Sequence, residues 1–140
     1  MATHRTGDAH RLERASSKIT VQHRELSDLE DGVRMAITDR DEIRTESAFV
    51  KLEGALEAHF ELEERAYYPS ADDLDAATAA RFRELRADHQ QLREDLSDLR
   101  DGLKQDGLDG LLRGFTAFAH DLAHHEEREE VLMEELLRGA

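Results

Sequence analysis

The chain has 140 residues, a formal net charge of −14 and no cysteine, which together suggest one domain and exclude disulfides, thiolate metal sites and cysteine catalysis. Such an acidic chain argues against nucleic acid or an anionic membrane as a partner. Its polar N-terminal stretch is not that of a signal peptide, and no apolar run approaches the roughly 18 residues of a membrane helix, so we expect a soluble, cytoplasmic protein.

Residues 1–10 are polar, and we expect a flexible N-terminal arm there, followed by a bundle domain at 11–140. Apolar residues then recur at helical spacing in four segments, which predict helices at about 16–38, 41–68, 73–103 and 108–138. The breaks between them are TDRDE at 38–42, Pro69 with its polar SADD turn, and QDGLDG at 105–110. Four narrow apolar stripes with short connections predict an all-α protein, an up-down-up-down antiparallel four-helix bundle.

Each predicted helix has one histidine on its apolar stripe, and two stripes have a glutamate one turn later. These residues are His23, His59 with Glu63, His89, and His125 with Glu129. Six polar groups among leucines and phenylalanines are costly without partners, and buried ion pairs seldom stabilise more than apolar packing does. Hydrogen-bonded core histidines are the alternative interpretation. Shared metal ions account for all six residues at once.

The two halves of the chain are similar when one is shifted by 66 residues. The shift lays His23 on His89, His59 on His125 and Glu63 on Glu129. At about 1.5 Å per residue, the two histidines of each predicted hairpin lie at one level, and the glutamates lie one turn, about 6 Å, further along. We therefore expect the six side chains to converge on one centre.

The ligand types narrow the choice of metal. A set of nitrogen and oxygen ligands without thiolate suits Fe, Mn or Zn. A single zinc site needs only three or four ligands. Six ligands divided evenly between two hairpins therefore favour two metals bridged by two carboxylates.

These motifs resemble those of the hemerythrin-like, or HHE cation-binding, domains. They are His23, HFELE at 59–63 followed by ERAYYP, His89, and HEERE at 125–129, and the resemblance covers about 16–138. It implies a four-helix bundle that holds two iron ions in an Fe–O–Fe type centre, with Mn or Zn as substitutes. By position, His23 and His59 would bind one iron, His89 and His125 the other, and Glu63 and Glu129 would bridge them.

One departure from the oxygen-carrying hemerythrins bears on function. Their third helix has a second histidine four residues after the first, and here that position is Arg93. The missing ligand argues against reversible oxygen carriage and leaves coordination positions for an exogenous ligand. We therefore expect a small diatomic or peroxide ligand.

The resemblance predicts a protein that binds or reacts with O2, peroxide or NO. Oxygen binding, redox or iron sensing, and weak catalase-like peroxide decomposition all fit, so whether the chain is an enzyme stays open. One alternative is a non-catalytic, metal-stabilised module that signals metal or redox state to an unidentified protein partner. The other is a helical scaffold with structural histidines.

Three further features concern the surroundings of the site: a tyrosine pair, one glutamate and a histidine pair. Tyr67 and Tyr68 follow Glu63 by four and five residues, so that one of them, with Tyr67 our candidate, could hydrogen-bond a ligand; plain packing is the alternative. Glu30 lies on the first stripe, and we expect it to be either a partner for a polar group beside the site or a residue at the edge of the stripe. Of the adjacent pair His124 and His125, both the stripe and the repeat select His125 as the inward residue.

Overall fold

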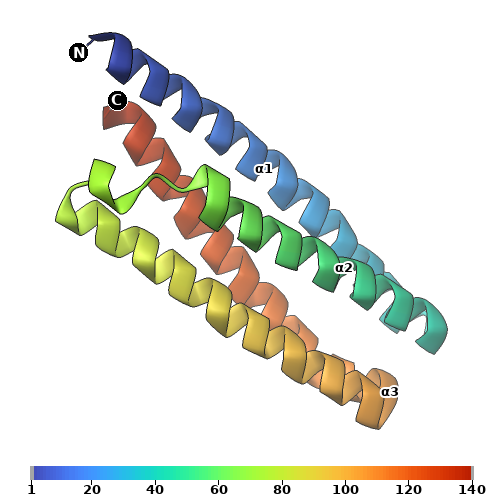
Figure 1. Ribbon diagram of the computed structural model, residues 1–140. Coiled ribbons are helices and arrows are strands. Elements are labelled where there is room, and N and C mark those ends of the chain that lie inside the picture. The colour runs from blue at the N-terminus through green and yellow to red at the C-terminus, as the bar shows by residue number, and fades with distance from the viewer. Residues whose placement is uncertain (1, 140) are drawn as a thin grey trace.

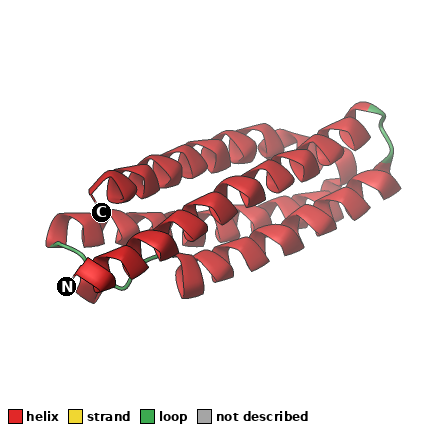
Figure 2. Ribbon diagram, turned by 90° about the horizontal axis from the view of Figure 1, so that it is seen from above, coloured by secondary structure: helices red, strands yellow, loops and turns green. Residues whose placement is uncertain are grey.

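The computed structural model describes the backbone of residues 2–139 and the side chains of residues 9–139. Over this range the chain is helical apart from short turns, so the predicted all-α class is confirmed. The elements are α1 (Ala2–Thr38), α2 (Glu42–Leu62), the π-helical η1 (Glu63–Tyr67), the 3₁₀ turn η2 (Ala71–Asp73) and α3 (Ala76–Gly139). Figures 1 and 2 show the helices lying lengthwise against one another, with both termini at one end.

The described chain has three α-helices, since α3 spans both the third and the fourth predicted helices, with a kink at the expected turn between them. Gly107 is the one residue inside α3 with non-helical backbone angles, φ 64° and ψ −140°. Residues 76–106, the first arm of α3, and residues 108–139, its second arm, lie side by side, with α3 doubling back between them (Figure 1). A positive φ of this kind favours glycine, and a Cβ here would lie 2.6 Å from Glu42 Oε1.

The turn between α1 and α2 lies where TDRDE predicted it. Asp41 caps α2, because its carboxylate accepts a hydrogen bond from the Arg44 amide at 3.0 Å. Helix α1, however, begins at Ala2 and not near residue 16, so the backbone of the predicted arm is helical. The division into an arm at 1–10 and a domain at 11–140 stays a prediction.

The second helix changes character before Pro69. Periodicity predicted one helix to residue 68, but α2 ends at Leu62 and a π-helical turn follows, closed by a 2.8 Å hydrogen bond from the Tyr68 amide to the Glu63 carbonyl. In an α-helix, residues five apart differ by about 140° around the axis. The wider π turn brings Tyr68 back to the face of Glu63, and such turns are frequent at functional sites.

Two apolar clusters occupy the interior, and the six predicted ligands fall between them along every helix. The larger cluster includes Leu26, Phe49, Leu96 and Phe115. The smaller one, towards the chain termini, includes Ile19, Tyr68, Phe82, Leu85 and Leu132. The bundle thus has a polar layer between two apolar ends.

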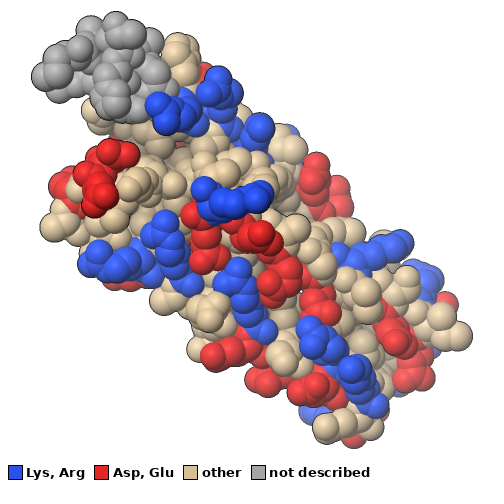
Figure 3. All heavy atoms as spheres, viewed as in Figure 1, with Lys and Arg blue, Asp and Glu red and all other residues tan. Residues whose placement is uncertain are grey.

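The surface is charged rather than apolar. On the face in Figure 3, basic and acidic side chains are interspersed and neither sign forms a broad field. None of the described helices is long and apolar enough to cross a membrane.

Candidate metal centre

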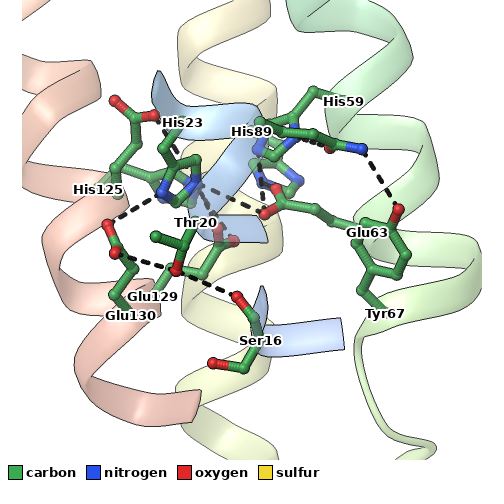
Figure 4. A network of polar contacts seen from close by, with 12 residues as sticks. Ser16, Thr20, His23, His59, Glu63, Tyr67, His89, His125, Glu129 and Glu130 are labelled. Carbon is green, nitrogen blue, oxygen red and sulfur yellow. Dashed lines mark hydrogen bonds and ion pairs between the residues drawn. The ribbon is translucent and has the colours of Figure 1, made fainter. Parts of the chain in front are cut away.

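Six buried side chains from four helical segments meet in the polar layer. Four of them, His23, His59, Glu63 and Glu129, offer ligand atoms that all lie within 4.8 Å of one another. A second group, consisting of Glu63, His89, His125 and Glu129, meets the same limit. Figure 4 shows these imidazoles and carboxylates pointing toward one another from α1, the end of α2 with η1, and both arms of α3. The structure therefore brings together every residue of the predicted ligand set, with both carboxylates common to the two groups.

The contacts follow the 66-residue repeat. His23 Nε2 lies 2.9 Å from Glu129 Oε1, and the repeat-related His89 Nε2 lies 3.0 Å from Glu63 Oε1. Within each helix, His59 Nε2 is 3.1 Å from Glu63 Oε2, and His125 Nε2 is 3.7 Å from Glu129 Oε2. The two hairpins thus contribute equivalent halves of the centre, each carboxylate lying near histidines of both halves.

Several of these ligand atoms have no hydrogen-bond partner in the protein. They are His59 Nε2, His125 Nε2 and both carboxylate oxygens of Glu63, all buried. Glu63 is 0% exposed, and although imidazole nitrogens lie 3.0–3.1 Å from its oxygens, a carboxylate without a hydrogen bond at that depth is unfavourable. Imidazole nitrogen and carboxylate oxygen are also the ligand types that iron, manganese and zinc accept. The centre therefore fits a metal ion in both its geometry and its unsatisfied atoms.

The outward nitrogen of each imidazole is held by a second polar residue. His23 Nδ1 lies 3.0 Å from Glu130 and His89 Nδ1 lies 3.2 Å from Glu64. These carboxylates are related by the repeat, since Glu64 and Glu130 are 66 residues apart. Partners of this kind fix ring orientation and keep the inward nitrogen free for a metal.

The other two imidazoles are oriented in the same way. His59 Nδ1 donates to Gln22 Oε1 at 2.5 Å, and His125 Nδ1 lies 2.9 Å from Asp88 Oδ2. Gln22 and Asp88 are again 66 residues apart. The sequence analysis did not identify these outer partners, although applying the repeat to the polar residues beside the ligands would have paired them.

Arg93, at the position of the missing histidine, supports the wall of the centre. Its guanidinium donates to Glu64 at 3.0 Å and to Glu57 at 3.2 Å, and it lies over the Phe60 ring at 5.5 Å. Glu64 in turn holds His89. Arg93 therefore acts on the centre through the orientation of a histidine.

Tyr68 is the tyrosine that reaches the ligands directly. Its hydroxyl donates to Glu129 Oε2 and lies 3.3 Å from His89 Nε2. Tyr67, our sequence candidate, instead accepts a hydrogen bond from Gln22 at 3.2 Å and reaches His59 only through that amide. Periodicity could not distinguish the two tyrosines, because it assumed a uniform α-helix through Glu63.

The protein environment separates the four histidines electrostatically. Burial lowers the pKa of His59 to about 3 and that of His89 to about 4, and it also lowers the pKa of His125. At His23, burial is again the largest single effect and lowers the pKa, but the hydrogen bonds to Glu129 and Glu130 and the charges of Glu126 and Glu129 together outweigh it and raise the pKa to about 9. Because their pKa values are lowered, the rings of His59, His89 and His125 are neutral at pH 7. Neutral imidazole is the form that binds a metal.

The carboxylates also have shifted pKa values. Burial, together with the neighbouring Glu129, raises the pKa of Glu63 well above its usual range. Burial likewise raises the pKa of Glu126 to about 8. Cations that replace these protons would relieve the same desolvation penalty.

Glu126 and Phe60 break the symmetry between the halves, because they are repeat-related but chemically different. Phe60 stacks on His89, with ring centroids 4.3 Å apart. Glu126 Oε2 lies 3.6 Å from His23 Nε2, is buried and has no hydrogen-bond partner. This inward carboxylate was not predicted from the sequence.

Two further predictions from the sequence concern Glu30 and the orientation of the pair His124 and His125. Glu30 is buried on α1 and pairs with Arg34 at 3.9 Å, which agrees with its expected role beside a polar group. His125 is buried and its neighbour His124 exposed, in the predicted orientation. Metal binding by the six central residues stays a prediction.

Comparisons with known proteins agree with the motif pattern. The family model described as the hemerythrin HHE cation binding domain matches residues 14–137, which is most of the chain. No curated protein and no solved structure matches the chain.

Proposed function

The chain belongs to the hemerythrin HHE cation-binding family, and on that premise we propose that it is a non-haem di-iron protein that binds or reacts with O2, peroxide or NO. Two iron ions would supply redox chemistry and coordination positions for a small ligand. The protein supplies a buried cage in which Glu63 and Glu129 belong to both ligand groups. Manganese and zinc suit the same ligand types.

The set of unsatisfied buried atoms at the centre is the observation that supports this proposal most. The carboxylate of Glu63 lies between His59 and His89, with both oxygens lacking a hydrogen bond. In our proposal Glu63 and Glu129, which belong to both ligand groups, would be the carboxylates shared by the two metals. His23 with His59, and His89 with His125, complete the two ligand groups.

In our proposal the small exogenous ligand reaches the centre from the side on which Tyr68 lies. A cavity of about 830 Å³ at the terminal end of the bundle is lined by Tyr67, Tyr68 and Leu132, among others. Tyr68 lines this cavity and donates a hydrogen bond to Glu129. In this proposal a small ligand approaches through the cavity, and the buried hydroxyl is placed to hydrogen-bond it.

The proposal includes the arrangement of the helices. We treat the two arms of α3 as separate third and fourth helices, which gives the up-down-up-down antiparallel bundle. The non-helical backbone at Gly107 supports this, as does the close approach of Gly102 and Gly110, where a Cβ on Gly110 would lie 2.0 Å from the Gly102 carbonyl oxygen.

Metal analysis combined with absorption spectroscopy tests the di-iron function. Protein produced with iron should contain about two iron ions per chain, the number that the two ligand groups imply. Its ferric form should have an ultraviolet–visible band that shifts with azide or peroxide. Fewer than two equivalents of iron, or zinc alone, would contradict the proposal.

A non-catalytic, metal-stabilised module is the second candidate, and the location of the centre between two apolar clusters favours it. In that case metal binding would contribute mainly to folding. Protein that unfolds on metal removal, yet never consumes peroxide or binds azide, would support the module over the reactive centre.

A further inference from the structure

A cleft that shares no lining residue with the cavity at Tyr68 includes His23. It has a volume of about 350 Å³ and is lined by Ala123, Val131, His23 and glutamates of the second arm of α3. These glutamates are Glu126, Glu127, Glu130 and Glu134, and the lining includes no lysine or arginine. The spacing places all four on one side of the helix.

The carboxylates form a series from solvent to the centre. Glu127 and Glu134 are exposed, the Glu130 side chain is 40% exposed and the Glu126 side chain 12%. Behind them lies His23, 8% exposed, and then Glu63 and Glu129, both 0% exposed. Carboxylate side chains therefore extend from the cleft mouth to the buried ligands, with His23 between the outer and the inner ones.

The inner end of the series has free ligand capacity. Glu126 Oε2 is buried without a hydrogen-bond partner and lies 3.6 Å from His23 Nε2. Glu63 Oε2, fully buried and also unpartnered, lies 3.9 Å from the same nitrogen. The cleft thus leads to unsatisfied carboxylate oxygens that are aimed at its end.

The cavity at Tyr68 has a different character. Its lining combines the basic side chains Arg11, Arg14, Lys18 and Arg81 with the acidic side chains Asp73, Asp75 and Glu135, and Arg81 pairs with Glu135. Charges of both signs offset one another there, whereas a cleft lined by carboxylates alone raises the local concentration of a cation. The glutamate-lined cleft is therefore the better suited of the two to a cation.

We propose that the glutamate-lined cleft is the route by which divalent cations reach the centre, with Glu126 as the last carboxylate before His23. The inference rests on the proposed metal-binding function and adds a direction of loading. A cation passes from Glu134 and Glu127 to Glu130 and Glu126, and then to the ligand group that contains His23.

Uptake kinetics of Co²⁺ by the metal-free full-length protein test this route, with visible absorbance as the readout. Glu127→Gln with Glu134→Gln should slow uptake about three- to tenfold at low salt, and the difference should shrink at high salt because screening weakens steering. The final Co²⁺ content should match that of the wild type. The control is Glu46→Gln with Glu94→Gln, which removes the same charge from exposed positions outside the cleft and should leave the rate unchanged.

A second pair of variants adds charge instead. Ala123→Lys places a cation in the cleft and should slow uptake, whereas Ser70→Lys places one in the other cavity and should not. The route would be overturned, with metal binding intact, if Ala123→Lys and the double variant at Glu127 and Glu134 both took up Co²⁺ at the wild-type rate. Slow uptake by Ser70→Lys would overturn it as well. Absence of Co²⁺ and Fe²⁺ binding by the wild type would overturn the proposed function as well.

Discussion

His124 and His125 are adjacent but lie in opposite environments, since His125 is 2% exposed and His124 is on the surface. His125→Ala should lose about half of the bound metal or more, because the ring belongs to one of the two ligand groups. His124→Ala should keep it. Elemental analysis of the purified variants measures both, and the reverse pattern would mean that the other histidine faces the centre.

Tyr68 offers a test of the ligand-facing side. Tyr68→Phe removes the hydroxyl that donates to Glu129 but keeps the ring packed on Phe82. Iron content should be retained, while azide affinity changes several-fold, about 1 kcal/mol, the typical net contribution of one hydrogen bond. Azide titration followed by absorbance measures this. Tyr67→Phe, which acts only through Gln22, is the matched control, and equal effects would contradict direct contact.

Glu30 predicts a pH dependence of stability outside the centre. Burial raises its pKa to about 7 from the usual 4.5, so the folded state retains a proton that the unfolded chain releases between these values. Its stabilising contribution is therefore complete below pH 4.5 and is lost as the pH rises through 7. Glu30→Gln should stabilise the metal-free protein more at pH 8 than at pH 5, by on the order of 1 kcal/mol after solvent screening.

Urea unfolding at both pH values measures this difference. The control, Glu25→Gln, alters an exposed glutamate on the same helix and should show little pH dependence. If the free-energy difference for Glu30→Gln is the same at pH 5 and pH 8, Glu30 does not have the proposed shift.

At the scale of elements, the spacing of apolar residues predicted the features that follow from a regular α-helix, namely a helix boundary and the side chains that face inward. It located the turn at 38–42 and directed His23 and His125 inward, because a 3.6-residue repeat fixes which side chains share a face. It missed the π turn, since one extra residue in a turn leaves no apolar signature, and therefore did not select Tyr68 over Tyr67. It missed Glu126 because a partly buried carboxylate beside the candidate metal centre has the same sequence pattern as a surface one.

The reversal of chain direction within α3 occurs at Gly107, whose φ is positive. Gly107→Ala should lower the free energy of unfolding by about 1–2 kcal/mol, because an L-residue is strained at a positive φ. The added Cβ would also meet the Glu42 carboxylate. Chemical denaturation measures the effect. Gly32→Ala, in helical backbone with no atom within 4 Å of the new Cβ, should instead be neutral or stabilising, and similar losses in both variants would contradict a specific strain at 107.

At the scale of the whole molecule, the polar layer divides the interior into two apolar clusters, so the stability of the bundle depends on how that layer is satisfied. Without metal, the layer contains unpartnered atoms of His59, Glu63 and His125. Metal ions would supply those partners and bind the folded state alone, and their binding free energy then adds to folding.

Removing the metal with a chelator should therefore lower the melting temperature by about 10 °C or more. The folded state loses several kcal/mol of metal-binding free energy, and each kcal/mol shifts the melting temperature by a few degrees. Differential scanning calorimetry of loaded and stripped protein measures this, and re-addition of Fe²⁺ should restore the original midpoint. His124→Ala should respond as the wild type does, whereas His125→Ala should respond less because it begins with less metal. Equal midpoints with and without metal would show that hydrogen bonds among the buried histidines and glutamates already satisfy the layer, which is the scaffold interpretation of the same six residues.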